Sequence, residues 1–243
     1  MALHHSPSIV TNGLSLYLDA ANAKSYTGSG TTWSNIMGGV PFHTGTGTVS
    51  GYSISYNGGL STGGESITDS YPFSLTTSNT IQIGMRSTKL GDSSSNCGDK
   101  RTTLWSKQFS TWYGHTCYIV PQGSNPDAST GTLAYSVYGT TTSSAQISTN
   151  IGVNTFYDVT TQYIPSSSFF YIKMFINGNL ISTSASTPLT TVANEVFRIG
   201  GRDNNCSNGS FIGNIFYVRL YNRELTVSEI RQNFNSIRGR FGV

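Results

Sequence analysis

The eleven acidic side chains of this sequence offer little for the cleavage of a polysaccharide. That chemistry needs two carboxylates about 5 to 9 Å apart across a cleft. On one face of a strand such a pair would lie two or four residues apart, and only Glu65 and Asp69, in GGESITDSYPF, have that spacing. Aromatic residues do not surround this pair, so we interpret the stretch as a polar loop or edge.

Other catalytic motifs are absent from the sequence. It contains no G-x-S-x-G nucleophile elbow, and the stretches GSGTTW and GTGTVS lack the third glycine and the lysine of phosphate-binding loops. His43 and His115 lie far apart in the chain. We therefore predict a protein that is not an enzyme and has no catalytic residue.

Two similar polar stretches, GDSSSNCGDKR and GRDNNCSNGS, raise the question of a metal. They supply Asp92, Asp99 and Asp203, and calcium takes six to eight oxygen ligands from loops of this kind. The same side chains also cap turns through local hydrogen bonds. We predict no required cofactor, with calcium as the alternative.

The sequence contains three cysteines and no C-x-x-C motif, which argues against a zinc site or a dithiol redox centre. Cys117 lies in the apolar run CYIV and is predicted to be a buried free thiol. Cys97 and Cys206 lie in the two polar stretches and are expected to approach each other. Whether they are bridged stays open, although synthesis in a cytoplasm favours free thiols.

Three aromatic residues fall in loop-like stretches and are candidates for stacking on sugars: Trp33, Trp112 and Tyr113. The alternative is that they anchor the core or its rim, which is the commoner fate of tryptophan.

Short stretches of alternating or apolar residues, separated by Gly and Asn, follow one another along the chain. Asn177-Gly178 predicts a tight hairpin turn. Thr226 and Glu229 form a capping box before an apolar stripe, which predicts a helix ended by Gly239. About ten or more strands and one terminal helix indicate an all-β fold, a two-sheet antiparallel jelly-roll sandwich. We expect an N-terminal arm at 1–8 and one domain at 9–243.

The stretch FIGNIFYVRLYNREL, residues 211–225, has large apolar groups at both alternating sets of positions. One set is Ile212, Phe216, Val218 and Leu220; the other is Phe211, Ile215, Tyr217 and Tyr221. We expect one set to fill the space between the sheets. The other is covered either by the terminal helix or by a second protein, which makes Phe216, Tyr217 and Tyr221 interface candidates.

The formal charge of +3 is too small to imply nucleic acid binding, but seven of the nine arginines lie at or beyond Arg198. Arg238 and Arg240 are therefore further interface candidates. No stretch approaches the roughly 18 apolar residues of a membrane helix, so no membrane insertion is expected. The start MALHHSPSIV has no signal-peptide pattern, which predicts synthesis in a cytoplasm.

Several motifs together resemble laminin-G-like, concanavalin A-like lectin/glucanase domains. They are the opening IVTNGLSLYLDAANAKSYTGSGTTWSN, the hairpin YIKMFINGNLIST, the strand EVFRIGG and the ending GNIFYVRLYNRELTVSEIRQNFN. More narrowly, the motifs resemble the versions of this domain carried by tailed phages, notably those of cyanobacteria. The E-x-D-x-x-E strand of hydrolases with this fold is absent, so their activity does not carry over.

The resemblance implies a non-enzymatic virion protein: a capsid decoration or cement subunit, or part of a tail or fibre. Its partners would be major capsid or tail proteins, with host-surface glycans as a further class. The alternative is a host-adhesion protein that binds carbohydrate with the help of calcium. A polysaccharide hydrolase ranks behind both, because the paired carboxylates are missing.

Overall fold

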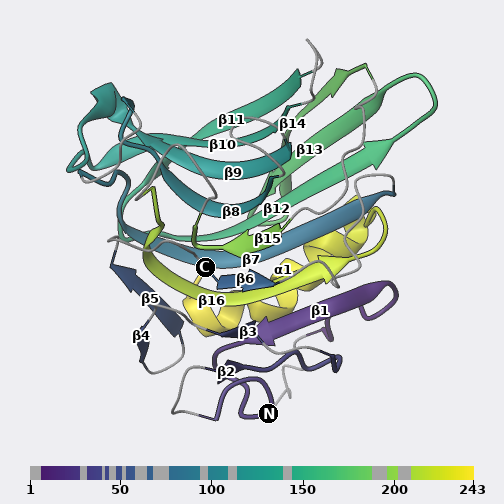
Figure 1. Ribbon diagram of the computed structural model, residues 1–243. Helices are drawn as coiled ribbons and strands as arrows, with labels where there is room; N and C mark the ends of the chain where they lie inside the picture. Colours follow the sequence, from purple (N-terminus) through teal and green to yellow (C-terminus); the bar gives the residue numbers. More distant parts are fainter. Residues whose placement is uncertain are drawn as a thin grey trace.

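A computed structural model of the chain describes residues 7–27, 32–39, 42–43, 48–50, 53–57, 65–67, 77–93, 98–108, 114–138, 144–187, 196–201 and 209–243. Two antiparallel sheets face each other and form a sandwich, with one helix at the C-terminal end (Figure 1). The predicted all-β jelly-roll fold is confirmed. In the described part of the chain, no helix has the length and apolar character needed to cross a membrane.

The larger sheet has eight strands and contains both the first strand and the last strand of the chain. Its order is β14-β13-β12-β7-β16-β5-β4, and β1 also pairs with β16. The bounds are β1 Leu14–Asp19, β4 Thr48–Ser50, β5 Ser53–Asn57, β7 Asn79–Lys89, β12 Phe156–Pro165, β13 Phe170–Ile176, β14 Asn179–Ser186 and β16 Ile212–Tyr221.

The smaller sheet has six strands in the order β11-β10-β9-β8-β15-β6. The bounds are β6 Glu65–Ile67, β8 Thr102–Gln108, β9 Gly114–Pro121, β10 Thr130–Tyr138, β11 Ser144–Gly152 and β15 Val196–Ile199. A separate pair joins β2, Thr32–Trp33, to β3, Phe42–His43, and a short 3-10 turn, Gln122–Ser124, follows β9.

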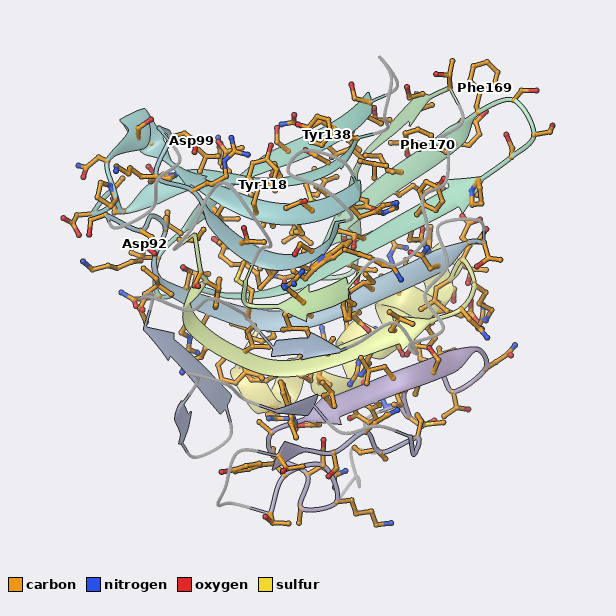
Figure 2. The ribbon with its side chains drawn as sticks, viewed as in Figure 1. Asp92, Asp99, Tyr118, Tyr138, Phe169 and Phe170 are labelled. Carbon is orange, nitrogen blue, oxygen red and sulfur yellow. The ribbon has the colours of Figure 1, made fainter. Side chains whose placement is uncertain are left out.

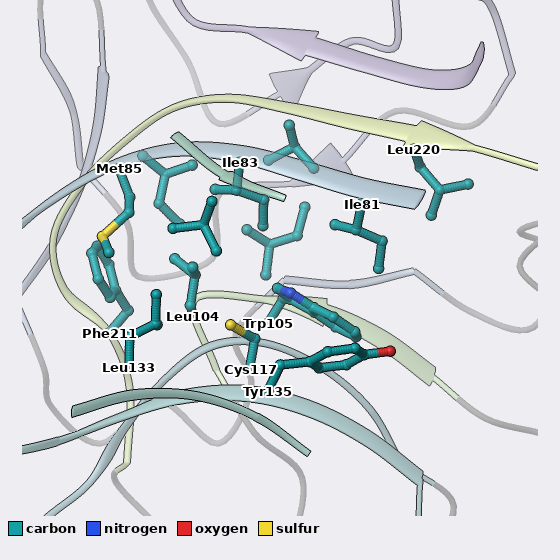
Figure 3. Close-up of a cluster of buried hydrophobic side chains, with 14 of the residues drawn as sticks. Ile81, Ile83, Met85, Leu104, Trp105, Cys117, Leu133, Tyr135, Phe211 and Leu220 are labelled. Atoms are coloured by element: carbon teal, nitrogen blue, oxygen red, sulfur yellow. The ribbon is translucent and has the colours of Figure 1, made fainter. Parts of the chain in front are cut away.

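The space between the sheets holds the main hydrophobic core. Ile81, Ile83 and Met85 project from β7 toward Trp105 and Cys117 of the smaller sheet (Figure 3). Period-two alternation produces this arrangement, because every second residue of a strand points to the same face. Cys117 is a buried free thiol, as predicted, and burial raises its pKa far above the ordinary value of a thiol.

The hairpin between β13 and β14 forms at Asn177 and Gly178, as predicted. Their φ angles are 51° and 75°, so both central residues adopt the left-handed conformation that this two-residue turn requires.

The predicted division of β16 into two faces is wrong in one respect. A β-bulge lies between Ile215 and Tyr217, where Phe216 has no partner on β7. The extra residue shifts the alternation by one position. Val218 therefore joins Ile215 in the main core, whereas Tyr217 points to the outer face.

The terminal helix α1, Val227–Phe241, covers that outer face. It begins with the predicted capping box of Thr226 and Glu229. It does not end at Gly239. The ring of Phe241 stacks on Phe156 at 3.9 Å and holds the last turn, and Gly242, in the left-handed conformation, ends the helix.

Candidate binding surface on the smaller sheet

The predicted interface tyrosines of β16 are buried inside the protein. Tyr217 and Tyr221 are both 0% exposed. Ile230 and Leu225 pack with Tyr221, and Ile237 packs with Tyr217. The terminal helix therefore covers this face, and neither tyrosine is available to dock a second protein.

A buried polar layer separates α1 from the larger sheet. The Tyr217 hydroxyl donates to Asp158, and Gln82 Nε2 donates to both Asp158 oxygens at 2.8 and 3.1 Å. The guanidinium of Arg219 lies 4.6 Å from the centre of the Tyr217 ring and 5.0 Å from that of Tyr17. Burial raises the pKa of Asp158, although its donors act in the opposite direction. This layer is enclosed and positions the helix.

The other predicted interface residues lie along the end of α1. Phe216 is half-buried and packs on Phe241 with ring centres 4.8 Å apart. Arg240 forms an ion pair with Asp19 at 2.8 Å, which ties the last turn to β1. Arg238 is exposed on the helix surface.

The outer face of the smaller sheet carries the best candidate site. In β9, Cys117 and Ile119 point into the core, so Thr116 and Tyr118 point outward. The same alternation in β10 sends Tyr135 inward and turns Ser136 and Tyr138 outward. Figure 2 labels Tyr118, Tyr138 and Asp99 on the strands of the smaller sheet and the segment beside them. We call the row formed by Asp99, Arg101, Tyr118, Ser136 and Tyr138 the tyrosine strip. Tyr118 and Ser136 are buried, at 5% and 0% exposure, whereas Asp99, Arg101 and Tyr138 are half-buried.

Asp99, Arg101 and Tyr118 form a rigid unit at one end of the strip. Arg101 Nε donates to both Asp99 oxygens at 2.9 Å, and its guanidinium lies 4.6 Å from the Tyr118 ring centre. Burial alone would raise the pKa of Asp99, but the hydrogen bonds and charge of Arg101 more than offset this effect, so the pKa lies below its usual value. The unit therefore presents planar polar groups with no net charge.

Tyr138 supplies a partly exposed ring at the other end of the strip. Tyr138 is half-buried, and its neighbours in the strand register are Gly114 on β9 and Ser144 on β11. Neither neighbour has a large side chain. Beyond Ser136 and along β11, the exposed side chains of Gln146, Ser148 and Asn150 add hydrogen-bonding groups.

The structure argues against Trp33 as a glycan contact. The side chain is only 2% exposed and belongs to the core between the sheets. Trp112 and Tyr113, which directly precede Gly114 in sequence, lie outside the described residues, and so do Cys97 and Cys206.

The described residues do not assemble a metal centre. No group of three His, Cys, Asp or Glu side chains with suitable placement occurs among them. Asp99 is bound by Arg101 at 2.5 Å, and Asp92 is buried at 4% exposure. Asp203 and Asp69 lie outside the described part of the chain, and the side chain of Glu65 is not described.

Sequence reasoning missed Arg101, Tyr118 and Tyr138. The signal was present in the alternation of CYIV and TLAYSVYG, where Tyr118 and Tyr138 fall at positions opposite in phase to the core residues. The sequence did not show that Tyr118, which points outward from β9, packs against Arg101, the residue directly before β8.

Comparison with known families places the chain in a class. The family model Laminin_G_3, described as the concanavalin A-like lectin/glucanases superfamily, matches residues 102–231, more than half of the chain. The chain therefore belongs to this superfamily. A comparison with curated protein sequences gave no match.

Solved structures share the fold at low sequence identity. A Trypanosoma rangeli sialidase in complex with 2,3-difluorosialic acid matches with a TM-score of 0.63 and 14% identity over 94% of this chain and 34% of that chain. The receptor binding domain of botulinum neurotoxin type G matches with a TM-score of 0.58 and 14% identity, over 92% of this chain and 51% of that chain. A third match is domain 4 of AbnA, an extracellular arabinanase from Geobacillus stearothermophilus, in complex with arabinotriose. Its TM-score is 0.52 and its identity 19%, over 90% of this chain and 97% of that chain. The chain thus spans about a third of the sialidase chain.

Proposed function

We propose that this protein is a non-enzymatic component of a tailed-phage particle, a capsid decoration or cement subunit or a part of the tail or fibre, and that its lectin-like sandwich binds glycans through the tyrosine strip. Its localisation is then the virion, and its other partners are major capsid or tail proteins. The sequence motifs support the virion assignment, because they resemble the versions of this domain in phages of cyanobacteria.

The geometry of the tyrosine strip supports glycan binding. The partly exposed ring of Tyr138 offers an apolar face, and the Asp99–Arg101 unit offers donors and acceptors fixed by their own hydrogen bonds. A few placed polar groups beside an aromatic surface are typical of small-ligand sites. Because Asp99 neutralises Arg101, the strip suits a neutral glycan better than an anionic one.

A relative with the same fold is consistent with this proposal. The structure of AbnA domain 4 contains arabinotriose, a neutral oligosaccharide, and the domain matches this chain over nearly its whole length. The likeness concerns the fold alone, so the proposal rests on the tyrosine strip.

The engagement of the carboxylates supports a non-enzymatic role. Seven acidic side chains are described: four form ion pairs, Asp99 is held by Arg101, Asp158 is enclosed beneath α1, and Asp92 is buried. The four pairs are Asp19–Arg240, Asp127–Lys89, Glu224–Lys173 and Glu229–Arg223. Glycoside hydrolysis needs two carboxylates that face each other across a cleft, whereas these seven are paired with basic side chains or buried.

The test has two arms. The first arm tests glycan binding. The purified protein is applied to an array of neutral and anionic glycans, with and without a calcium chelator. Binding to neutral glycans in the presence of chelator supports the tyrosine strip. Binding abolished by chelator indicates the calcium-assisted alternative, and an absence of binding rejects the glycan role. Purified phage particles that lack this chain would reject the virion assignment.

A further inference from the structure

Large exposed apolar side chains gather at one edge of the larger sheet. Among the described residues, seven large apolar side chains are exposed, and four of them lie on or beside β13 and β14: Phe169, Tyr171, Leu180 and Ile181, at 39–48% exposure. The adjacent Phe170 is 0% exposed and belongs to the core. Figure 2 shows Phe169 and Phe170 at the same end of the sheet.

The helix α1 reaches only the hairpin end of this edge. Phe175 packs with Ile230 of the helix, and Gly178 lies beside Phe234, whereas Tyr171, further along β13, stays exposed. The nearest charge on the outer face of β13, Lys173, is paired with Glu224 at 2.7 Å. The edge is therefore apolar and locally neutral.

The strand β14 is an open edge. In the described part of the chain it pairs only with β13, and β11 lies beside it in the other layer without joining the ladder. Its residues, NLISTSAS, are exposed or half-buried, and none is charged or proline. Edge strands usually carry charges, prolines or bulges that oppose pairing with another chain. Of these three features, β14 has only a bulge near its start. The bulge lies between Leu180, which pairs with Phe175, and Ser182, which pairs with Met174.

We propose that β14 pairs with β14 of a second copy of this chain, antiparallel and about a two-fold axis perpendicular to the sheet. Residues that face each other in antiparallel strands point to the same side of the sheet. The two-fold axis must therefore lie between one residue of β14 and the same residue of the second copy. A register centred on Thr183 places Thr183 opposite itself and Ile181 opposite Ala185. This pairing joins the larger sheets of both copies into one.

The outer face of that joined sheet explains the exposed residues. Ala185 is the partner of Tyr171 within one copy. The Ile181 side chain of the second copy would therefore pass over the small Ala185 and pack on the Tyr171 ring, and the two-fold axis repeats this contact. Within one protomer Ile181 and Tyr171 lie at opposite ends of the hairpin, and pairing brings them together.

A second copy fits this edge better than a charged partner. Self-pairing of a charged strand would place like charges opposite each other, which destabilises a sheet. β14 has no charge, so pairing with itself carries no such cost. The contact is isologous and closes at two copies, as in most homo-oligomers. The proposal is independent of the glycan role.

The first test is the mass of the full chain in solution, measured by light scattering and sedimentation over a wide concentration range. We expect a dimer. Ile181→Lys should weaken dimerisation at least about tenfold, because it places a charge opposite Ala185 and beside Tyr171. Met37→Lys adds the same charge at a residue of similar exposure, 47%, outside the edge and should leave the dimer intact. A monomer at every concentration, or a dimer insensitive to Ile181→Lys, overturns the proposal.

The second test fixes the register. Thr183→Cys should form a disulfide between copies under mild oxidation, because the two side chains face each other at the axis. In this register, residue 186 faces Leu180 of the second copy. The two cysteines of Ser186→Cys would then lie six residues apart along the strand, or about 20 Å, and should not form a disulfide. The natural chain under the same oxidation sets the background from its three cysteines. A dimer that cross-links through Ser186→Cys and not Thr183→Cys contradicts the proposed register.

Discussion

The ring of Tyr217 lies against the backbone of Gly84, its partner in the β7–β16 ladder. A Cβ atom built on Gly84 would lie only 2.6 Å from Tyr217 Cζ. The glycine thus makes room for the tyrosine, whose hydroxyl then reaches Asp158 on β12. One small residue on β7 positions the polar layer beneath α1.

Gly84→Ala should destabilise the protein by about 1–3 kcal/mol, because a methyl group at this position displaces a buried ring. Thermal unfolding measures the effect. Gly152→Ala is the matched control, since the nearest atom to its Cβ would be 3.6 Å away, an ordinary contact distance. Equal stability of both variants would show that Tyr217 does not need the space.

Tyr217→Phe should destabilise the protein by about 1–3 kcal/mol, because it removes a donor from a buried carboxylate. The pKa of Asp158 is already raised, first by burial, and loss of the tyrosine raises it further. A group with a raised pKa contributes its stability at low pH and loses it as pH rises. The stability gap between the natural protein and the variant should therefore widen as pH rises from below about 3.8, the ordinary pKa of an aspartate.

Tyr221→Phe is the control for this pH dependence. Its hydroxyl donates to Val10 O and accepts from Asn233 Nδ2, so it contacts no carboxylate. Its stability gap should stay constant from about pH 4 to pH 7. A constant gap for Tyr217→Phe as well would contradict the role of the Asp158 charge.

Glu229→Gln should lower stability by about 1 kcal/mol near neutral pH through loss of the capping-box charge. The hydrogen bonds from Arg223 are the main reason that the pKa of Glu229 falls from 4.5 to about 2. A group with a lowered pKa stabilises the fold above its unfolded value, and this contribution is lost as pH falls. The gap between the two proteins should therefore shrink as pH drops from about 4.5 to about 2.

Denaturant unfolding at several pH values checks this expectation. Ser228→Ala lies in the same helical turn at an exposed position and should change stability little at any pH. If the stability difference between the natural protein and Glu229→Gln instead grew as the pH fell, the Glu229 carboxylate would not be the stabilising group.

Tyr138→Ala should weaken binding of a glycan found on the array at least about fivefold, or about 1 kcal/mol, because it removes the accessible ring of the tyrosine strip. Calorimetry with the monovalent glycan measures the affinity. Tyr171→Ala removes a more exposed tyrosine from the larger sheet, and it should leave the affinity unchanged because the proposed dimer contact of Tyr171 is independent of the glycan site. Equal losses in both variants would place the site elsewhere.

Cys117 should resist alkylation in the native protein and react only on unfolding. Its thiol is buried and its pKa is raised by desolvation, and the thiolate is the reactive form. Iodoacetamide treatment followed by mass spectrometry of the peptide that contains Cys117 gives the rate. Modification in native buffer as fast as that of an exposed thiol would show that the core opens.

The local features of this fold were readable from the sequence because neighbouring residues determine them. The Asn177-Gly178 turn needs two left-handed residues, and the capping box needs Thr226 and Glu229 three positions apart; both occur as predicted. Period-two alternation likewise identified most of the longer strands and the buried Cys117, although it missed β11, Ser144–Gly152. The length of α1 was predicted less well, because Phe241 continues the helix past Gly239 by stacking on Phe156, a residue of a distant strand.

The tertiary structure alone decided which surfaces are open. The sequence showed that both faces of β16 are apolar, but one unpaired residue, Phe216, shifted the alternation, and α1 covered Tyr217 and Tyr221. On the smaller sheet, Tyr118 and Ser136 are buried, whereas Tyr138 and Arg101 stay partly exposed. A pattern along one strand fixes which residues share a face, whereas the exposure of that face depends on contacts between segments far apart in the chain.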